Sequence, residues 1–215
     1  MVAELGRLEP VDLSFAGERP LFAALGDFAF ERGGPLTKLF LEELPESFDG
    51  PLIVDSSLLW LNRGQGPRTR WFHHEVFPGE TRNGYGRANG ELGAEHVACA
   101  FGAGAGRDFL VGRLPDPESL YCVDPEQFVV RDERLRRLRD ERQLGQAHVA
   151  ARTLHRYSGA SFLRALPADA AGFHFFIRAS RGSERAVVNG FRNVAGSTFT
   201  GPWQQEFQHD ARREM

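Results

Sequence analysis

The pattern of hydrophobic and polar positions divides the chain into a short helical start and a longer strand-rich remainder. Leu36, Leu39 and Phe40 recur at helical spacing. Pro35 precedes them, at a position that suits the first turn of a helix. We therefore expect helices within residues 20–44.

Beyond residue 50 the apolar residues come in short runs that are separated by Gly- and Pro-rich turns, a pattern typical of strands. The expected strands are residues 51–61, 69–77, 95–102, 108–114, 119–123, 148–157, 172–180 and 185–191, with a further candidate at 127–130. The glycine-rich stretch 102–108 lacks the Lys-Ser/Thr of a phosphate-binding loop and predicts a tight turn between strands. Short strands at this spacing favour a sandwich, barrel or jelly roll.

One charged segment interrupts the strands. Residues 131–145 contain six arginines and four acidic residues, with Leu135, Leu138 and Leu144 as a narrow apolar stripe. This pattern predicts a helix, which we interpret as a solvated surface helix. A surface for a partner or an anionic ligand is the alternative interpretation.

Length and composition indicate one globular domain. With 215 residues, 41% hydrophobic and 26% charged, we expect a single domain over 1–215. Within it, a helical preface (1–50) precedes a β-rich core (51–200) and a polar tail (201–215). No apolar run approaches the roughly 20 residues needed to cross a bilayer. No secretory signal is visible at the N-terminus.

Charge and cysteine content narrow the classes further. The net charge of −3 weighs against nucleic acid as a partner. The two cysteines, Cys99 and Cys122, lie in apolar runs and predict buried thiols rather than a disulfide framework. We therefore expect a reducing compartment and a cytoplasmic protein with no membrane association. The sequence leaves a homo-oligomer open.

The clearest chemical pattern lies in the expected strand 69–77. Side chains alternate across a strand, so Trp71, His73, Glu75 and Phe77 share one face. An imidazole and a carboxylate that point the same way are two adjacent ligands for one metal ion. The flanking aromatic rings would make the surroundings apolar, which strengthens the attraction between ligand and cation.

Two later segments carry further candidate residues. In the expected strand 148–157, His155 is a candidate third ligand. In the expected strand 172–180, Arg178 and Ser180 share a face, where a guanidinium and a hydroxyl could bind a small carboxylate.

These motifs resemble those of the Fe(II)/2-oxoglutarate-dependent oxygenases, double-stranded β-helix proteins with a His-x-Asp/Glu…His triad and a later basic residue. The resemblance covers roughly residues 51–191. It implies that His73, Glu75 and His155 bind Fe(II), and that Arg178 with Ser180 binds 2-oxoglutarate. Two histidines and one carboxylate leave positions open on iron for the keto acid and for O₂. The implied fold is mainly β, a double-stranded β-helix (jelly roll) with N-terminal helices and one inserted charged helix.

The resemblance leaves the third metal ligand open. The spacing from His155 to Arg178 is longer than usual for this family, and His-x-Glu is rarer than His-x-Asp. His148 or His174 could replace His155. If His174 were the ligand, Arg185 would lie at the more usual distance for the carboxylate-binding residue.

The implied activity is hydroxylation of a small polar or amino-acid-like substrate. Trp71 and the loop 83–90, through Tyr85 and Arg87, are the candidate substrate contacts. An ordinary surface loop is the alternative for that segment. A histidine beside a carboxylate is also often only a hydrogen-bonded pair. The alternative function is a non-catalytic β-sandwich used for binding or assembly.

Overall fold

The structure, a computed structural model, describes residues 2–9, 15–67, 72–73, 93–113 and 126–192, with side chains in the last range described from residue 130 onward. These residues form a mainly β architecture of antiparallel sheets with three α-helices. In chain order the elements are β1 (Ala3–Arg7), β2 (Leu21–Phe22), β3 (Ala24–Leu25), α1 (Gly26–Arg32), α2 (Pro35–Glu42), a 3-10 turn (Glu46–Phe48), β4 (Ile53–Leu61), β5 (Glu95–Gly102), β6 (Arg107–Val111), α4 (Glu126–Asp140), β7 (Gly145–Val149), β8 (Thr153–Ser158), β9 (Leu163–Ala165), β10 (Gly172–Arg181) and β11 (Gly190–Phe191).

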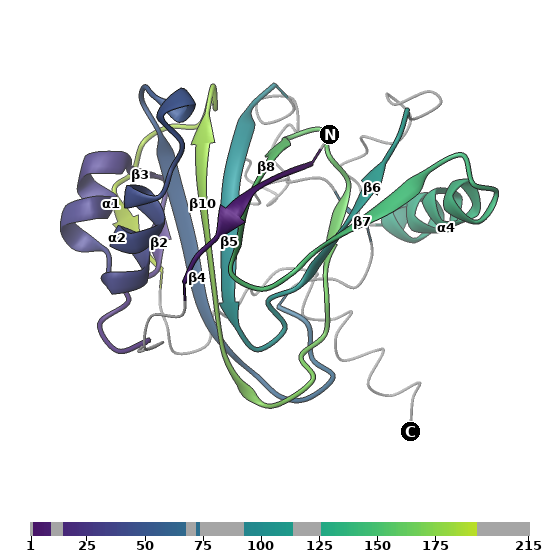
Figure 1. The fold of residues 1–215 in the computed structure, drawn as a ribbon, viewed down its shortest axis with the longest axis horizontal. Coiled ribbons are helices and arrows are strands. Elements are labelled where there is room, and N and C mark those ends of the chain that lie inside the picture. The colour runs from purple at the N-terminus through teal and green to yellow at the C-terminus, as the bar shows by residue number, and fades with distance from the viewer. Residues whose placement is uncertain (1, 10–14, 68–71, 74–92, 114–125, 193–215) are drawn as a thin grey trace.

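The elements stack in four layers (Figure 1). A six-stranded sheet in the order β1-β8-β5-β10-β4-β3 has α1 and α2 on one face and a three-stranded sheet, β7-β6-β9, on the other. Helix α4 covers the far side of the three-stranded sheet. A small two-stranded sheet joins β11 to β2.

Strand β10 is the centre of the six-stranded sheet, paired with β4 on one side and β5 on the other. Its residues alternate between two environments. Phe175 and Ile177 pack in the apolar core beneath α1 and α2, whereas Phe176 packs in the core between the two sheets. We call the side of the six-stranded sheet that carries Phe176 the inner face, because the three-stranded sheet covers it.

The predicted helix behind Pro35 is confirmed. Pro35 is the first residue of α2, and Leu36 and Phe40 are buried against the sheet. The helix begins with support from Glu18, whose carboxylate accepts hydrogen bonds from the Leu36 N–H and the Thr37 hydroxyl. Burial nevertheless raises the pKa of Glu18 more than these hydrogen bonds lower it.

The remainder of the expected helical segment is only partly helical. Helix α1 covers Gly26–Arg32, but the residues before it form the short strands β2 and β3. Here the main chain pairs with remote segments, β2 with β11 and β3 with β4, so tertiary pairing overrides the local helical spacing.

Several strand predictions are confirmed within one or two residues at each end, namely β4, β5 and β10; β6 ends three residues earlier than expected. The expected strand 148–157 is two strands, β7 and β8, because the chain turns between them at Arg152, whose φ is 63°. Only Gly190–Phe191 of the expected strand 185–191 is a strand. Of 69–77 only 72–73 is described, and 119–123 and 201–215 lie outside the described residues.

The candidate strand at 127–130 is wrong, because these residues lie in α4. A run of four residues is too short to show whether its period is that of a strand or of a helix. The helix-forming residues that follow decide the conformation. The strands β1 and β9 were not expected. They are short, and pairing with β8 and β6 stabilises them.

The glycine-rich turn between β5 and β6 is confirmed. Gly102 has φ of 83°, a conformation that favours glycine. A Cβ at this position would lie 2.1 Å from the carbonyl oxygen of Phe173 on β10, so a side chain would separate the two central strands. The turn therefore requires glycine for both its conformation and its packing.

The predicted helix at 131–145 is confirmed in part, because α4 covers Glu126–Asp140 and Gly145 begins β7. The helix is not merely a solvated one. Leu135 and Leu138 are buried with Phe72, Leu144 and Phe162 on the far side of the three-stranded sheet. Two of its charged residues are also buried, Arg131 at 4% and Asp132 at 3% exposure. Burial of charged side chains is rare unless they are paired, so these two residues have a specific role in the packing.

Within the described ranges, no helix is both long enough and apolar enough to cross a membrane. Cys99 is buried with a free thiol, as predicted, and burial raises its pKa to about 12. Such a thiol stays protonated and unreactive at neutral pH. Cys122 lies outside the described residues.

Candidate functional site

The inner face of the six-stranded sheet is unusually polar for the interior of a sandwich. Alternation along β10 places His174, Arg178 and Ser180 on the same side as Phe176. The register across β5 and β8 adds further side chains to this face. Besides Phe176, its buried polar and aromatic members include Asp55, His96, His155, Tyr157, His174, Arg178 and Ser180.

One row of this face runs across three strands, from Ser180 on β10 through His96 on β5 to Tyr157 on β8. The Nδ1 atom of His96 lies 3.0 Å from the Ser180 hydroxyl, and its ring centroid lies 5.2 Å from that of Tyr157. His96 therefore orients the hydroxyl that the sequence places beside Arg178.

His155 projects from β8 into the space between the sheets. Its ring stacks on Tyr157 and meets the edge of Phe109 from the three-stranded sheet, with centroids 5.7 and 5.4 Å apart. Its Nδ1 atom lies 2.9 Å from the carbonyl oxygen of Thr153. A carbonyl only accepts, so Nδ1 carries the proton, and in the neutral ring Nε2 is the atom that can bind a metal.

His174 has the same arrangement at the other end of the inner face. Its Nδ1 atom donates to the carbonyl oxygen of Ala103 at 2.8 Å. In the neutral ring its Nε2 atom is again the nitrogen with the lone pair. The hydrogen bond at Nδ1 therefore leaves Nε2 as the coordinating nitrogen in both rings, and it does not distinguish His155 from His174 as a metal ligand.

His73 approaches from the opposite sheet. Its N–H donates to the carbonyl of Leu163 at 2.9 Å, and the Leu163 N–H donates back at 2.8 Å, which adds this residue to the edge of the three-stranded sheet next to β9. Leu163 packs between the sheets, so the side chain of His73, opposite it, points inward too. His73 is buried at 8% exposure.

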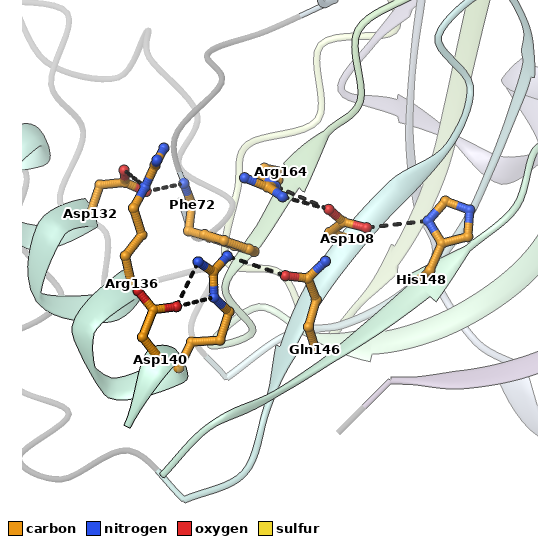
Figure 2. Close-up of polar contacts among 9 residues, drawn as sticks. Phe72, Asp108, Asp132, Arg136, Asp140, Gln146, His148 and Arg164 are labelled. Carbon is orange, nitrogen blue, oxygen red and sulfur yellow. Dashed lines mark hydrogen bonds and ion pairs between the residues drawn. The ribbon is translucent and has the colours of Figure 1, made fainter. Parts of the chain in front are cut away.

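His148 lies on the other side of that sheet (Figure 2). Its Nδ1 atom lies 3.2 Å from Asp108 Oδ1, and Arg164 binds Oδ2 of the same carboxylate through two nitrogens at 2.9 and 3.1 Å. These three residues form a row across β7, β6 and β9, and the His148 side chain is 56% exposed. His148 is therefore turned away from His73 and is the poorest candidate for the third ligand.

Arg178 is fully buried and belongs to a charged cluster that the sequence analysis missed. Its register partner on β4 is Asp55, whose Oδ2 atom lies 3.4 Å from Arg178 Nη2. The same carboxylate also binds Arg185 and Arg192. The Ala23 N–H donates to the same carboxylate at 3.1 Å. The only local signal was an aspartate within the apolar run of residues 51–61.

Electrostatics of this cluster favour the ionised carboxylate. Burial by itself would raise the pKa of Asp55. The hydrogen bond from Arg185 and the positive charges of Arg178, Arg185 and Arg192 together outweigh burial and lower the pKa to about 2. Asp55 is thus an anion at every physiological pH.

The structure brings together part of the predicted site. His155, Arg178 and Ser180 share the inner face, and His73 reaches the same interior from the facing sheet. The other predicted site residues lie outside the described residues: Trp71, Glu75, Tyr85 and Arg87. Among the residues that the structure describes, no three His, Cys, Asp or Glu side chains are grouped to hold a metal ion.

Two of the described histidines nevertheless have the chemistry of metal ligands. Two buried imidazoles from different sheets, one with Nδ1 bound to a main-chain carbonyl, are the nitrogen ligands that iron accepts. Glu75, the carboxylate of the predicted triad, follows His73 by two residues in the sequence and lies outside the described residues. The chain matches no protein-family model, and neither a curated protein nor a solved structure matches it.

Proposed function

We propose that this protein is a non-haem iron, 2-oxoglutarate-dependent oxygenase that hydroxylates a small polar or amino-acid-like substrate. One observation carries the proposal, namely the buried polar inner face. A sandwich that served only as a scaffold would bury aliphatic side chains there, since burying polar groups costs free energy. Three histidines and an arginine at 0–1% exposure on one sheet face are instead typical of a functional site.

Strand pairing supports a jelly-roll core. Among the described residues, the seven strands from β4 to β10 and the bridged segment 72–73, which comes second in chain order, make eight pairing segments, and their pairing is nested. The first (β4) pairs with the eighth (β10), the second (72–73) with the seventh (β9), the third (β5) with the sixth (β8) and the fourth (β6) with the fifth (β7). Nested pairing of this kind is what a long hairpin rolled into two sheets produces.

The residues have separate roles in this proposal. His73, Glu75 and His155 would hold the iron, which when bound supplies activation of O₂ coupled to oxidation of 2-oxoglutarate. The aromatic rings of Phe109 and Tyr157 against His155 limit water around that ligand. Trp71, Tyr85 and Arg87 would contact the substrate. A reducing cytoplasm suits both ferrous iron and the free Cys99 thiol.

Arg178 and Ser180 would bind the far carboxylate of 2-oxoglutarate. Ser180 is oriented by His96, and Arg178 belongs to a cluster in which three guanidinium groups face one carboxylate among the described residues. That surplus of positive charge favours a dianionic cosubstrate. Asp55 in this view fixes the position of Arg178 from the neighbouring strand.

The proposal predicts a spectroscopic result. Protein purified without air and loaded with Fe(II) should develop a weak visible charge-transfer band as 2-oxoglutarate is added, because the keto acid chelates the iron. Succinate, which lacks the keto group, is the matched control and should produce no band. Protein that binds neither iron nor 2-oxoglutarate would exclude the oxygenase.

One observation favours the alternative of an assembly protein. Trp60 and Phe173 are register partners on β4 and β10 and stay 58% and 42% exposed, with their rings in edge contact at 5.0 Å. An exposed aromatic pair is a frequent element of protein interfaces. Light scattering separates the two functions, since a concentration-dependent rise in mass without iron binding would favour assembly.

A further inference from the structure

The strand segment that carries His73 is held by α4 as well as by β9. In an antiparallel pair, neighbouring residues direct their main-chain groups to opposite sides. Those of His73 bond to Leu163, so those of Phe72 point away from β9. Main-chain groups at a sheet edge need a partner when they are buried.

Two charged side chains of α4 provide that partner. Asp132 Oδ1 accepts a hydrogen bond from the Phe72 N–H at 2.9 Å, and Arg131 Nη2 donates to the Phe72 carbonyl at 3.3 Å. Figure 2 shows the Asp132 contact and the ion pair of Asp132 with Arg136. The Arg136 Nε atom donates to the other carboxylate oxygen of Asp132 at 2.6 Å. A carboxylate and a guanidinium thus replace the acceptor and the donor that a neighbouring strand would supply.

Packing of the Phe72 side chain holds the same segment in place. The Phe72 ring is fully buried with Leu135 and Leu138 of α4, and the Arg164 guanidinium lies 4.7 Å from its centroid. Since neighbouring side chains alternate, a Phe72 ring held beneath α4 directs His73 toward the inner face. A shift of one residue would exchange the two side chains between the faces.

We propose that Asp132 and Arg131 are positioning residues for His73: by binding both main-chain groups of Phe72 they set the register in which His73 faces the site. The inference rests on the proposed function, in which His73 is a metal ligand. This role explains why Arg131 and Asp132 are buried, which the packing of the α4 leucines does not explain. Residues that orient a ligand typically change metal affinity 10–100-fold when they are replaced.

The first test needs no metal. In the wild-type protein the Phe72 amide hydrogen should exchange slowly, and His73 should resist diethyl pyrocarbonate, with peptide mass spectrometry as the measurement. Asp132→Ala should increase the labelling rate of His73, because loss of the Phe72 contact frees the segment that buries the His73 ring. Asp140→Ala, at an exposed residue of the same helix, is the matched control and should leave both measurements unchanged.

The second test uses the iron-loaded protein. Asp132→Ala should weaken Fe(II) binding about 10–100-fold and change the 2-oxoglutarate charge-transfer band. Asp132→Asn retains an oxygen that accepts from the Phe72 N–H and should restore most of the affinity. A role confined to folding would change thermal stability without changing the band of the folded, iron-loaded fraction.

The outcomes are distinct. If the wild-type protein binds no iron, the proposed function fails. If it binds iron while Asp132→Ala leaves the affinity, the band and the His73 labelling unchanged, the positioning role fails alone. Should Asp132→Ala not fold, the wild-type amide decides, because an unprotected Phe72 N–H contradicts the inference without any variant.

Discussion

Replacement of Asp55 by alanine is expected to lower the free energy of unfolding by about 3–5 kcal/mol, because removal of one partner leaves buried charges without compensation. Asp55 is bonded to Arg178, Arg185 and Arg192, which come from β10 and from the chain after it. The carboxylate also accepts from the Ala23 N–H. Urea unfolding followed by circular dichroism measures the change.

A matched control distinguishes this effect from the general loss of an acidic residue. Asp169 is exposed, so Asp169→Ala should change stability by less than about 0.5 kcal/mol. Asp55→Asn keeps the shape and part of the hydrogen bonding, and should fall between the two. Equal stabilities for Asp55→Ala and Asp169→Ala would show that the cluster contributes nothing to folding.

The same residue predicts a pH dependence. The pKa of Asp55 is lowered from its usual 3.8 to about 2 in the folded protein. A lowered pKa stabilises the fold above the unfolded value, and that stability is lost as the pH falls from near 3.8 through about 2. The difference corresponds to about 2 kcal/mol. Wild-type stability should therefore fall more steeply than that of Asp55→Asn over this interval; parallel curves would contradict the assignment.

The second large effect is expected at the two adjacent proposed metal ligands. His73→Ala and Glu75→Ala should each weaken Fe(II) binding by about 100-fold or more, since each removes a ligand rather than its supporting contact. Both variants should stay folded, as judged by circular dichroism. Calorimetric titration with Fe(II) under argon measures the affinity. Loss of thermal stability without any change in iron binding would show that the pair is structural.

The third ligand is decided by a comparison of histidine variants. His155→Ala is expected to abolish the 2-oxoglutarate band, whereas His174→Ala should retain it. His148→Ala is the matched control, because His148 is half exposed and pairs with Asp108 on the side of the sheet that faces away from His73. Loss of the band in His174→Ala alone would make His174 the third ligand, with Arg185 as the alternative carboxylate-binding residue.

The local pattern of apolar residues was enough to predict an element where that element buries one regular face. The apolar spacing behind Pro35 predicts α2, and the β-forming runs predict β4, β5 and β10, because each of these elements has its own side-chain period. Alternation also predicted that Arg178 and Ser180 share a face. The turn at Gly102 follows from the glycines alone.

Pairing between remote residues decided the rest. The strands β1 and β9 and the short pairs of β2 and β3 exist only because partners far away in the chain satisfy their main-chain groups. No local period indicated that Asp55 would meet three arginines from beyond residue 177. The strand candidate at 127–130 failed because four apolar residues suit either period.

By itself, therefore, the sequence determined the elements with a clear period of their own, α2, β4, β5 and β10, and which side chains share a face of these strands, since both depend on neighbours a few residues away. Only the tertiary structure decided that His155 and Arg178 lie inside the sandwich, that His148 lies outside it and that α4 holds the Phe72–His73 segment. The physical reason is that burial and ion pairing depend on distances in space, which sequence separation does not determine.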